Sequence, residues 1–377
     1  MSGEGPPPGG NGTANCKDYD DVHTVHLVWH SLVLALGLPL NGVALWVFLC
    51  YFPCSNKTVV YMVNLATCDL LFTLSLPLRI YYYAWGDWPL GDVPCQVAGS
   101  LFQINQYGSC LFLACINVDR LLALAYPLRA RHLRRPKVAW QACAAVWAVI
   151  VLGCVPVALA HDTSRCLDGN GTVQLRCFES FSRRAWRREI LPLVLLQFLL
   201  GFLLPLVTVL YCTARALRAL SRAADSPGPG KRRKAMRLLL SSTAIFVVCF
   251  LPYNVALLVY TSLKAGPPGA AYPGQQARAR WALQLAMLPA CANCCLDPLV
   301  YYFSTEGFRK TFRAKGTVRS EETRERWISL SSRKSRRVRG RRPPAPAGGD
   351  PPEEELLGLG NGSPPTCPAG TPEEPIS

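Results

Sequence analysis

Seven long apolar stretches, separated by short polar ones, constrain this chain more than any other feature. They run over 24–50, 57–83, 95–125, 138–160, 190–213, 237–262 and 281–303. Each is long enough for a hydrocarbon core that needs about 20 helical residues. Lipid offers no hydrogen-bond partner to an open backbone, so each stretch is predicted to be a transmembrane helix. Prolines inside these stretches are tolerated in a bundle, where neighbouring helices satisfy the freed carbonyls: Pro39, Pro77, Pro156, Pro205, Pro252 and Pro298.

Composition favours a membrane protein over a soluble one. Half of the 377 residues are hydrophobic and 17% are charged, which is too apolar for an ordinary soluble protein. The formal charge of +16 would indicate nucleic acid if the basic residues formed one patch on a soluble domain, but they lie in loops and in the tail. We therefore expect no nucleic-acid partner.

The sequence contains no motif typical of an enzyme. Five histidines form no HExxH pattern, and there is neither a GxSxG motif nor a phosphate-binding Walker loop. His23 and His26 are interpreted as an exposed pair rather than as metal ligands. A transporter or channel is a remote alternative, since no internal repeat indicates inverted halves.

The charge of the loops predicts the orientation. The stretch 126–138 carries five cations and no acid, and the stretch 213–237 carries eight cations against one acid. Both loops belong to one side of the bundle, so the positive-inside rule places that side in the cytoplasm and the N-terminus outside the plasma membrane. The sequons at Asn11 and Asn170 then face the exterior, where glycosylation occurs.

Two carboxylates lie in the middle of predicted spans. Asp69 is central to the second stretch and Asp297 to the seventh. A charge at this depth costs about 2.5–3.5 kcal/mol on insertion scales, so both are expected to face the bundle interior. With Asn41, Ser109 and Asn293 they supply enough oxygen atoms to hold a sodium ion. Alternatively both are neutral carboxyls that hydrogen-bond their neighbours. No other cofactor is expected.

An aspartate and an arginine are adjacent at the cytoplasmic end of the third stretch. Arg120 can pair with Asp119 in one state and turn toward a cytoplasmic partner in another, which makes this a two-state element. An arginine that simply reaches lipid headgroups explains the base but not the acid beside it.

Motifs on all seven stretches together resemble the rhodopsin-like G-protein-coupled receptors, over residues 20–315. The matching positions are Asn41, Leu65-Ala66-(x)2-Asp69, Asp119-Arg120-Leu121, Trp147, Pro205, Cys249-Phe250-Leu251-Pro252 and Asp297-Pro298-Leu299-Val300-Tyr301. The resemblance implies an all-α membrane protein: a seven-transmembrane helix bundle over 24–303 after an extracellular segment at 1–23. It also implies a short amphipathic eighth helix over 304–314, and composition predicts a disordered cytoplasmic tail over 315–377.

Two residues place the resemblance within one branch of the family. Phe250 and Asp297 are typical of the branch that holds purinergic and lysophospholipid receptors. Two departures from the family pattern predict a different balance between the inactive and active states of the switch. Most relatives have Tyr where this chain has Leu121, and many have Tyr where it has Thr213.

The resemblance also implies a signalling route. An agonist would shift the sixth helix at Phe246, Phe250 and Pro252, with Tyr301 taking part in the switch. Asp119, Arg120, Pro127 and Leu128 would then meet a heterotrimeric G protein, of the Gq and G-twelve/thirteen classes. Arrestin, receptor kinases and membrane lipids are the other partners implied.

Four cysteines lie outside in this topology, and four allow three pairings. The resemblance implies Cys95 with Cys177, which leaves Cys16 with Cys166. Purinergic-type receptors usually tie the N-terminus to the third extracellular loop instead, but residues 263–279 contain no cysteine.

Arginines near the outer helix ends predict an anionic ligand. Guanidinium groups bind phosphate through two parallel hydrogen bonds, and Arg79, Arg187 and Arg280 are the candidates. Gln103 belongs to a mixed surface suited to a glycerol-like linker beside an acyl chain. Arg79 is ten residues from Asp69, about 80° off the inward face of an ideal helix, and Pro77 can swing it back. We expect an anionic lysophospholipid agonist, with lysophosphatidic acid favoured by resemblance; the alternative is a nucleotide or other small organic anion.

Overall fold

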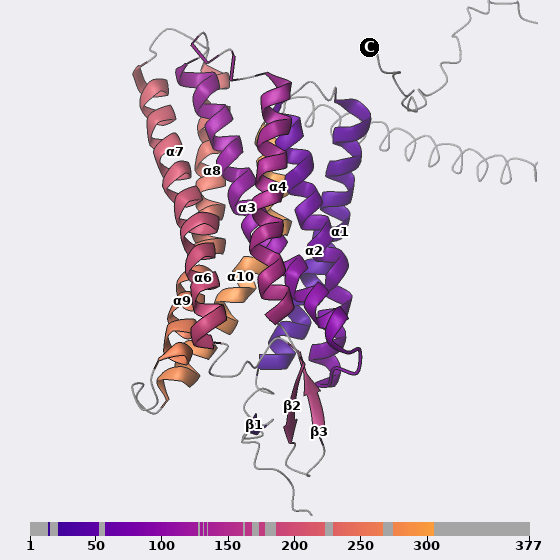
Figure 1. The fold of residues 1–377 in the computed structure, drawn as a ribbon. Coiled ribbons are helices and arrows are strands. Elements are labelled where there is room, and N and C mark those ends of the chain that lie inside the picture. Colours follow the sequence, from indigo (N-terminus) through magenta and orange to yellow (C-terminus); the bar gives the residue numbers. More distant parts are fainter. Residues whose placement is uncertain are drawn as a thin grey trace, which may run out of the picture. The chain divides into compact units, whose positions relative to one another are not determined.

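The computed structural model describes a bundle whose helices follow the predicted spans. The described residues are 14–15, 22–52, 57–126, 129–130, 132–133, 135–160, 163–167, 173–177, 186–222, 229–266 and 274–304. Within them, seven helices are long and apolar enough to cross a membrane. The first four are α1 (His23–Tyr51), α2 (Lys57–Trp85), α3 (Asp92–Ala125) and α4 (Pro136–Ala160), and the seventh is α10 (Gln275–Ser304) (Figure 1).

The fifth and sixth spans each change helix type before a proline. In the fifth, a π-helical turn (Trp186–Ile190) precedes α6 (Leu191–Leu196), and a second (Gln197–Leu203) precedes α7 (Leu204–Arg222). In the sixth, α8 (Pro229–Ile245) is followed by a π-helical turn (Phe246–Phe250) and by α9 (Leu251–Ala265). Pro205 and Pro252 lack an N–H and crowd the preceding turn, which explains the wider turn directly before each.

A small sheet, which the sequence analysis did not predict, covers one end of the bundle. It orders β1 (Ala14–Asn15), β2 (Ser164–Leu167) and β3 (Val173–Arg176), with β1 parallel and β3 antiparallel to β2. A disulfide joins Cys95 of α3 to Cys177, with 5.8 Å between the Cα atoms. The amide of Trp88 also donates to Leu175 of β3 at 3.0 Å. We call this the hairpin end; the opposite end, where α3 meets α4, is the basic-loop end (Figure 1).

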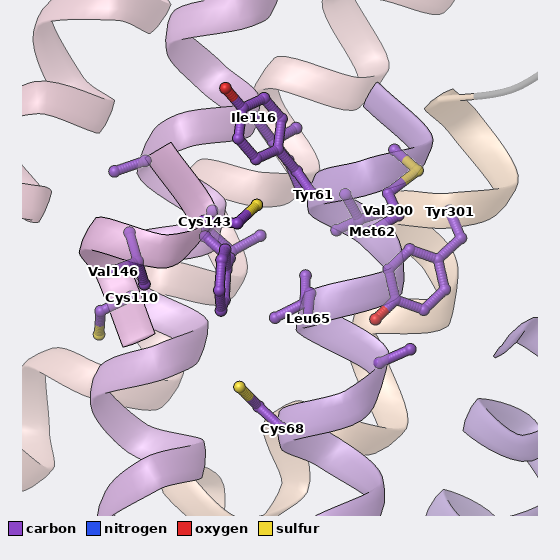
Figure 2. Close-up of a cluster of buried hydrophobic side chains, with 14 of the residues drawn as sticks. Tyr61, Met62, Leu65, Cys68, Cys110, Ile116, Cys143, Val146, Val300 and Tyr301 are labelled. Atoms are coloured by element: carbon purple, nitrogen blue, oxygen red, sulfur yellow. The ribbon is translucent and has the colours of Figure 1, made fainter. Parts of the chain in front are cut away.

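Close packing of α2, α3, α4 and α10 forms the largest apolar cluster of the described residues. Leu65, Cys68 and Val300 are fully buried in it, and the Tyr301 hydroxyl points toward α2 (Figure 2). On the other side of α3, a Cβ atom at Gly201 would lie 2.5 Å from the Tyr107 ring. Glycine at this position therefore allows the fifth span to approach α3.

Some predicted segments lie outside the described residues. The chain divides into units at 1–308 and 309–377, and the second unit is wholly outside the described residues. The same holds for nearly all of the predicted eighth helix, for the tail, and for the two sequons at Asn11 and Asn170.

Candidate ligand and signalling sites

Arg79 lies inside the bundle rather than at its surface. It is 3% exposed, although α2 places it near the hairpin end, two residues after Pro77. Its Nη2 donates to the carbonyl of Ala98 on α3 at 3.2 Å, and its guanidinium carbon stands 5.0 Å from the centre of the Phe102 ring. A buried guanidinium beside an aromatic ring face is a candidate partner for an anionic ligand.

The surroundings of Arg79 are apolar and aromatic. Phe102 packs edge-on against Tyr253 of α9 at 5.4 Å between ring centres and also against Phe72 at 5.8 Å. Trp186, at the start of the fifth span, packs edge-on against Tyr260 at 5.6 Å. These residues share one apolar cluster with side chains of α1 and α10. A buried cation beside an extended apolar surface suits an amphiphile with an anionic head.

The other predicted ligand residues lie on different elements. Gln103 follows Phe102, is half-buried, and its buried Oε1 accepts no hydrogen bond from the described residues. Arg280 is half-buried in the second turn of α10. Arg187 is exposed in the first turn of the fifth span.

A stack of histidines next to Arg79 was missed, and the prediction of an exposed pair is wrong. His23 and His26 are 7% and 1% exposed, and His30 is fully buried. His26 and His30 stack on Tyr83 of α2, with ring centres 4.9 and 5.3 Å apart. The spacing of three and four residues was the available signal, because it puts all three rings on one helix face, here turned toward α2.

The two mid-span carboxylates are fully buried and surrounded by amide and hydroxyl groups. Asn105 donates to Oδ1 of Asp69 at 2.8 Å, and the Tyr301 hydroxyl donates to Oδ2 at 3.4 Å. On α10, Asn293 donates to Oδ2 of Asp297 at 3.4 Å. Five buried oxygen atoms of this region have no partner among the described residues: those of Asn41, Asn105, Ser109 and Asn293, and Oδ1 of Asp297. Such a set of hard oxygen donors fits a small cation.

At the basic-loop end, a threonine that sequence reasoning missed connects Asp119 and Arg120. Thr58 of α2 donates to Oδ2 of Asp119 at 2.8 Å and accepts from Nη2 of Arg120 at 2.7 Å. Asp119 is 6% exposed, whereas Arg120 is half-buried. The predicted coupling residues Pro127 and Leu128 lie outside the described residues.

Two phenylalanines of the predicted switch, Phe246 and Phe250, form one column with Phe202 between the fifth and sixth spans. Phe246 and Phe250 are fully buried, with ring centres 5.3 Å apart, and Phe202 stacks on Phe246 at 5.9 Å. Pro252 is exposed at the start of α9. Because π-helical turns carry these rings, a change between π and α geometry would rotate them.

The two departures from the family pattern have structural partners. The Thr213 hydroxyl lies 2.9 Å from the hydroxyl of Thr243, so it links the fifth and sixth spans. Leu121 is buried in an apolar cluster with Cys212 and Leu239. A small hydroxyl contact thus connects these helices at the basic-loop end.

The cysteines at the hairpin end agree with part of the prediction. The disulfide between Cys95 and Cys177 is present. Cys166 belongs to β2, where its Cα is paired with Ala14 of β1, while Cys16 lies outside the described residues.

Seven spans, buried carboxylates on the second and seventh, and an Asp-Arg pair closing the third define a rhodopsin-type receptor. The family model for seven-transmembrane receptors of the rhodopsin family matches residues 40–301, well over half of the chain. The chain belongs to this family and is a G-protein-coupled receptor, a multi-pass protein of the plasma membrane and not an enzyme.

Among curated proteins, the chain is similar to lysophosphatidic acid receptors. It is 52% identical to lysophosphatidic acid receptor 5 of Mus musculus over 80% of each chain. It is 53% identical to the protein of the same name from Bos taurus, over 79% of this chain and 80% of that one. A purinoceptor of Rattus norvegicus is 36% identical over 74% of this chain and 85% of its own.

Proposed function

We propose that this receptor is activated by an anionic lysophospholipid, with lysophosphatidic acid the favoured agonist. The observation that carries the proposal is Arg79, a guanidinium buried against Phe102 at the edge of an aromatic and aliphatic cluster. The phosphate would bind Arg79, with Arg280, Arg187 and Gln103 as further candidates, while the acyl chain contacts the cluster. Relatives with 52–53% identity that carry the name lysophosphatidic acid receptor 5 support the same ligand class.

The proposed orientation has the hairpin end outside the cell and the basic-loop end in the cytoplasm. It rests on the cation-rich loops over 126–138 and 213–237. In this orientation the Cys95–Cys177 disulfide lies in an oxidising compartment. Agonist binding would move the sixth span at the phenylalanine column and release Arg120 toward a heterotrimeric G protein of the Gq and G-twelve/thirteen classes. Arrestin and receptor kinases would act on the same face.

A sodium ion is proposed at the buried carboxylates. Asp69, Ser109, Asn293 and Asp297 would hold it, and the oxygen atoms of Ser109, Asn293 and Asp297 that have no partner among the described residues fit a hard cation. The ion would supply positive charge that balances the carboxylates in the resting receptor. The hydrogen bonds that Asn105 and Tyr301 donate to Asp69 link α2, α3 and α10.

A nucleotide is the second candidate ligand, favoured by the similarity to a rat purinoceptor. The two ligand classes differ in their dependence on an acyl chain. Cells expressing the receptor would be exposed to lysophosphatidic acids of decreasing chain length and to a nucleotide panel, with calcium release as the readout. A lysophospholipid site loses about 0.8 kcal/mol for each methylene removed. Activation by nucleotides together with indifference to chain length would refute the proposal.

A further inference from the structure

A crevice on the side of the bundle has neither Arg79 nor a residue of the phenylalanine column among its lining residues. It has a volume of about 360 Å³ and walls from α2, α3, α4 and α7. Small-molecule sites generally measure about 300–1,000 Å³. Leu204 and Leu133, two of its lining residues, are 57% and 48% exposed, so the crevice opens sideways at the surface that the bilayer surrounds.

The polarity of the crevice changes along its length. Deeper in the bundle its walls are aliphatic, with Leu111, Ala142 and Val146 among them. Its charged lining residues, Lys57 and Asp119, both lie at the basic-loop end. An apolar slot with charged groups at one end matches an amphiphile lying parallel to the helices.

The sign of the charge at this end is positive. The carboxylate of Asp119 accepts from Thr58, whose hydroxyl accepts from Arg120, so a cation already balances the acid. Lys57 adds a further cation, and the exposed Arg135 and Lys137 stand in the chain between the lining residues Leu133 and Val138. The stretch 126–138 contains no acid. Phospholipids with anionic heads are attracted to such clusters by about 1 kcal/mol for each cation.

We propose that this crevice is a specific site for an anionic phospholipid of the leaflet that borders the basic-loop end. One acyl chain occupies the aliphatic slot between α4 and α7, and the phosphate lies at the end marked by Lys57, Arg135 and Lys137. The site is separate from the agonist site, and the assignment stands whichever ligand activates the receptor. Because Asp119 lines the crevice, a bound lipid adds contacts to the arrangement in which Thr58 connects Asp119 and Arg120.

The test measures lipid bound to the full-length purified receptor by native mass spectrometry. The probes are 1-palmitoyl-2-oleoyl phosphatidylserine, the phosphatidylcholine with the same chains, and cholesterol. The serine lipid is expected to bind in a saturable manner and more tightly than the choline lipid. Lys57→Gln should weaken the serine lipid about fivefold and leave the choline lipid unchanged, as expected for one cation near an anionic head.

Two variants block the slot from opposite walls, so that a folding defect in one leaves the other informative. Ala142→Phe on α4 and Thr208→Phe on α7 should each abolish saturable binding of the serine lipid. Val149→Phe is the matched control, because Val149 is an exposed residue of α4 that does not line the crevice. Equal binding of the two phospholipids, preference for cholesterol, or full binding in both blocked variants would each overturn the assignment.

Discussion

Thr58 at the start of α2 donates a hydrogen bond to Asp119 at the end of α3, with 2.8 Å between the two oxygen atoms. The same hydroxyl accepts from Arg120 at 2.7 Å. One threonine therefore holds both members of the Asp-Arg pair, and through them it ties the second span to the third. The pair alone could be read from the sequence, but the residue that restrains it could not.

Replacing this hydroxyl is expected to raise activity without agonist. Thr58→Val keeps the shape of the side chain and removes hydrogen bonds to charged groups, each worth about 1.5–3 kcal/mol. A loss in this range increases the fraction of receptor with a released Arg120 by at least roughly tenfold. The measurement is nucleotide exchange on a purified G protein by receptor in nanodiscs. Thr67→Val is the control, since among the described residues that hydroxyl bonds only to the carbonyl of Val63 in its own helix, at 2.8 Å. Equal basal exchange in the two variants would contradict the restraint.

Removing the buried guanidinium is expected to reduce agonist potency. Arg79→Ala leaves the phosphate of lysophosphatidic acid without its buried partner, a loss of about 2–5 kcal/mol, or at least roughly 30-fold in potency. Arg79→Lys should lie between, because an ammonium keeps the charge but not the planar fork. Arg188→Ala is the control, an exposed arginine of the fifth span. Potency is read from dose–response curves at matched surface expression; a potency in Arg79→Ala equal to that of the control would exclude the clamp.

The fold could largely be predicted from hydropathy, because each span must satisfy its backbone in lipid. The predicted fifth stretch, 190–213, is shorter than the helix, which continues to Arg222. The last two turns of α7 carry basic residues, so the apolar stretch ends at the membrane surface while the helical hydrogen bonds continue beyond it. The strands β1 to β3 escaped prediction because segments of two to four residues depend on their partners rather than on local propensity.

Only some residues of the candidate sites could be predicted from the sequence. Asp69, Asp119 and Arg120 are conspicuous as charges in apolar sequence, and Arg79, two residues after Pro77, is buried. Thr58 and the histidines of α1 are ordinary residue types, and their importance comes from which helix they face. That depends on the rotation of whole helices, which a single sequence does not specify.

The close approach of the fifth span to α3 predicts a sensitive glycine. A Cβ atom at Gly201 would lie 2.5 Å from Cδ1 of Tyr107, so Gly201→Ala must displace the ring or the helix. Overpacking of this kind costs about 1–3 kcal/mol and should lower the melting temperature of the purified receptor. At Gly42 on α1 an added Cβ meets no atom within 4 Å, so Gly42→Ala should leave the melting temperature unchanged or slightly higher. Equal melting temperatures in the two variants would argue against this packing.

Sodium is expected to stabilise the resting receptor through Asp69. Purified receptor should melt at a higher temperature in sodium chloride than in choline chloride at equal ionic strength, because a bound ion stabilises the state that binds it. Asp69→Asn removes the charge but keeps an oxygen atom near Asn105, and it should abolish the difference between the two salts. Asn64→Asp would not serve as a control, because Asn64 accepts a hydrogen bond from Trp147. Thr67→Val leaves every carboxylate in place, so it is the control and should keep the difference in melting temperature between the two salts. A sodium effect that survives Asp69→Asn would place the ion elsewhere.

A second disulfide is expected to fix the N-terminal segment to the hairpin. In the parallel pairing of β1 with β2, Ala14 stands opposite Cys166, and Cys16 follows β1 directly. Peptide mapping of the unreduced receptor should therefore recover a linked peptide containing Cys16 and Cys166, alongside the Cys95–Cys177 peptide that serves as the internal reference. Cys16→Ser should expose one new thiol, at Cys166, and lower stability by about 2–4 kcal/mol, since the bond would close a long loop. Alkylation of Cys166 in the unreduced wild-type receptor would show that β1 is held by backbone pairing alone.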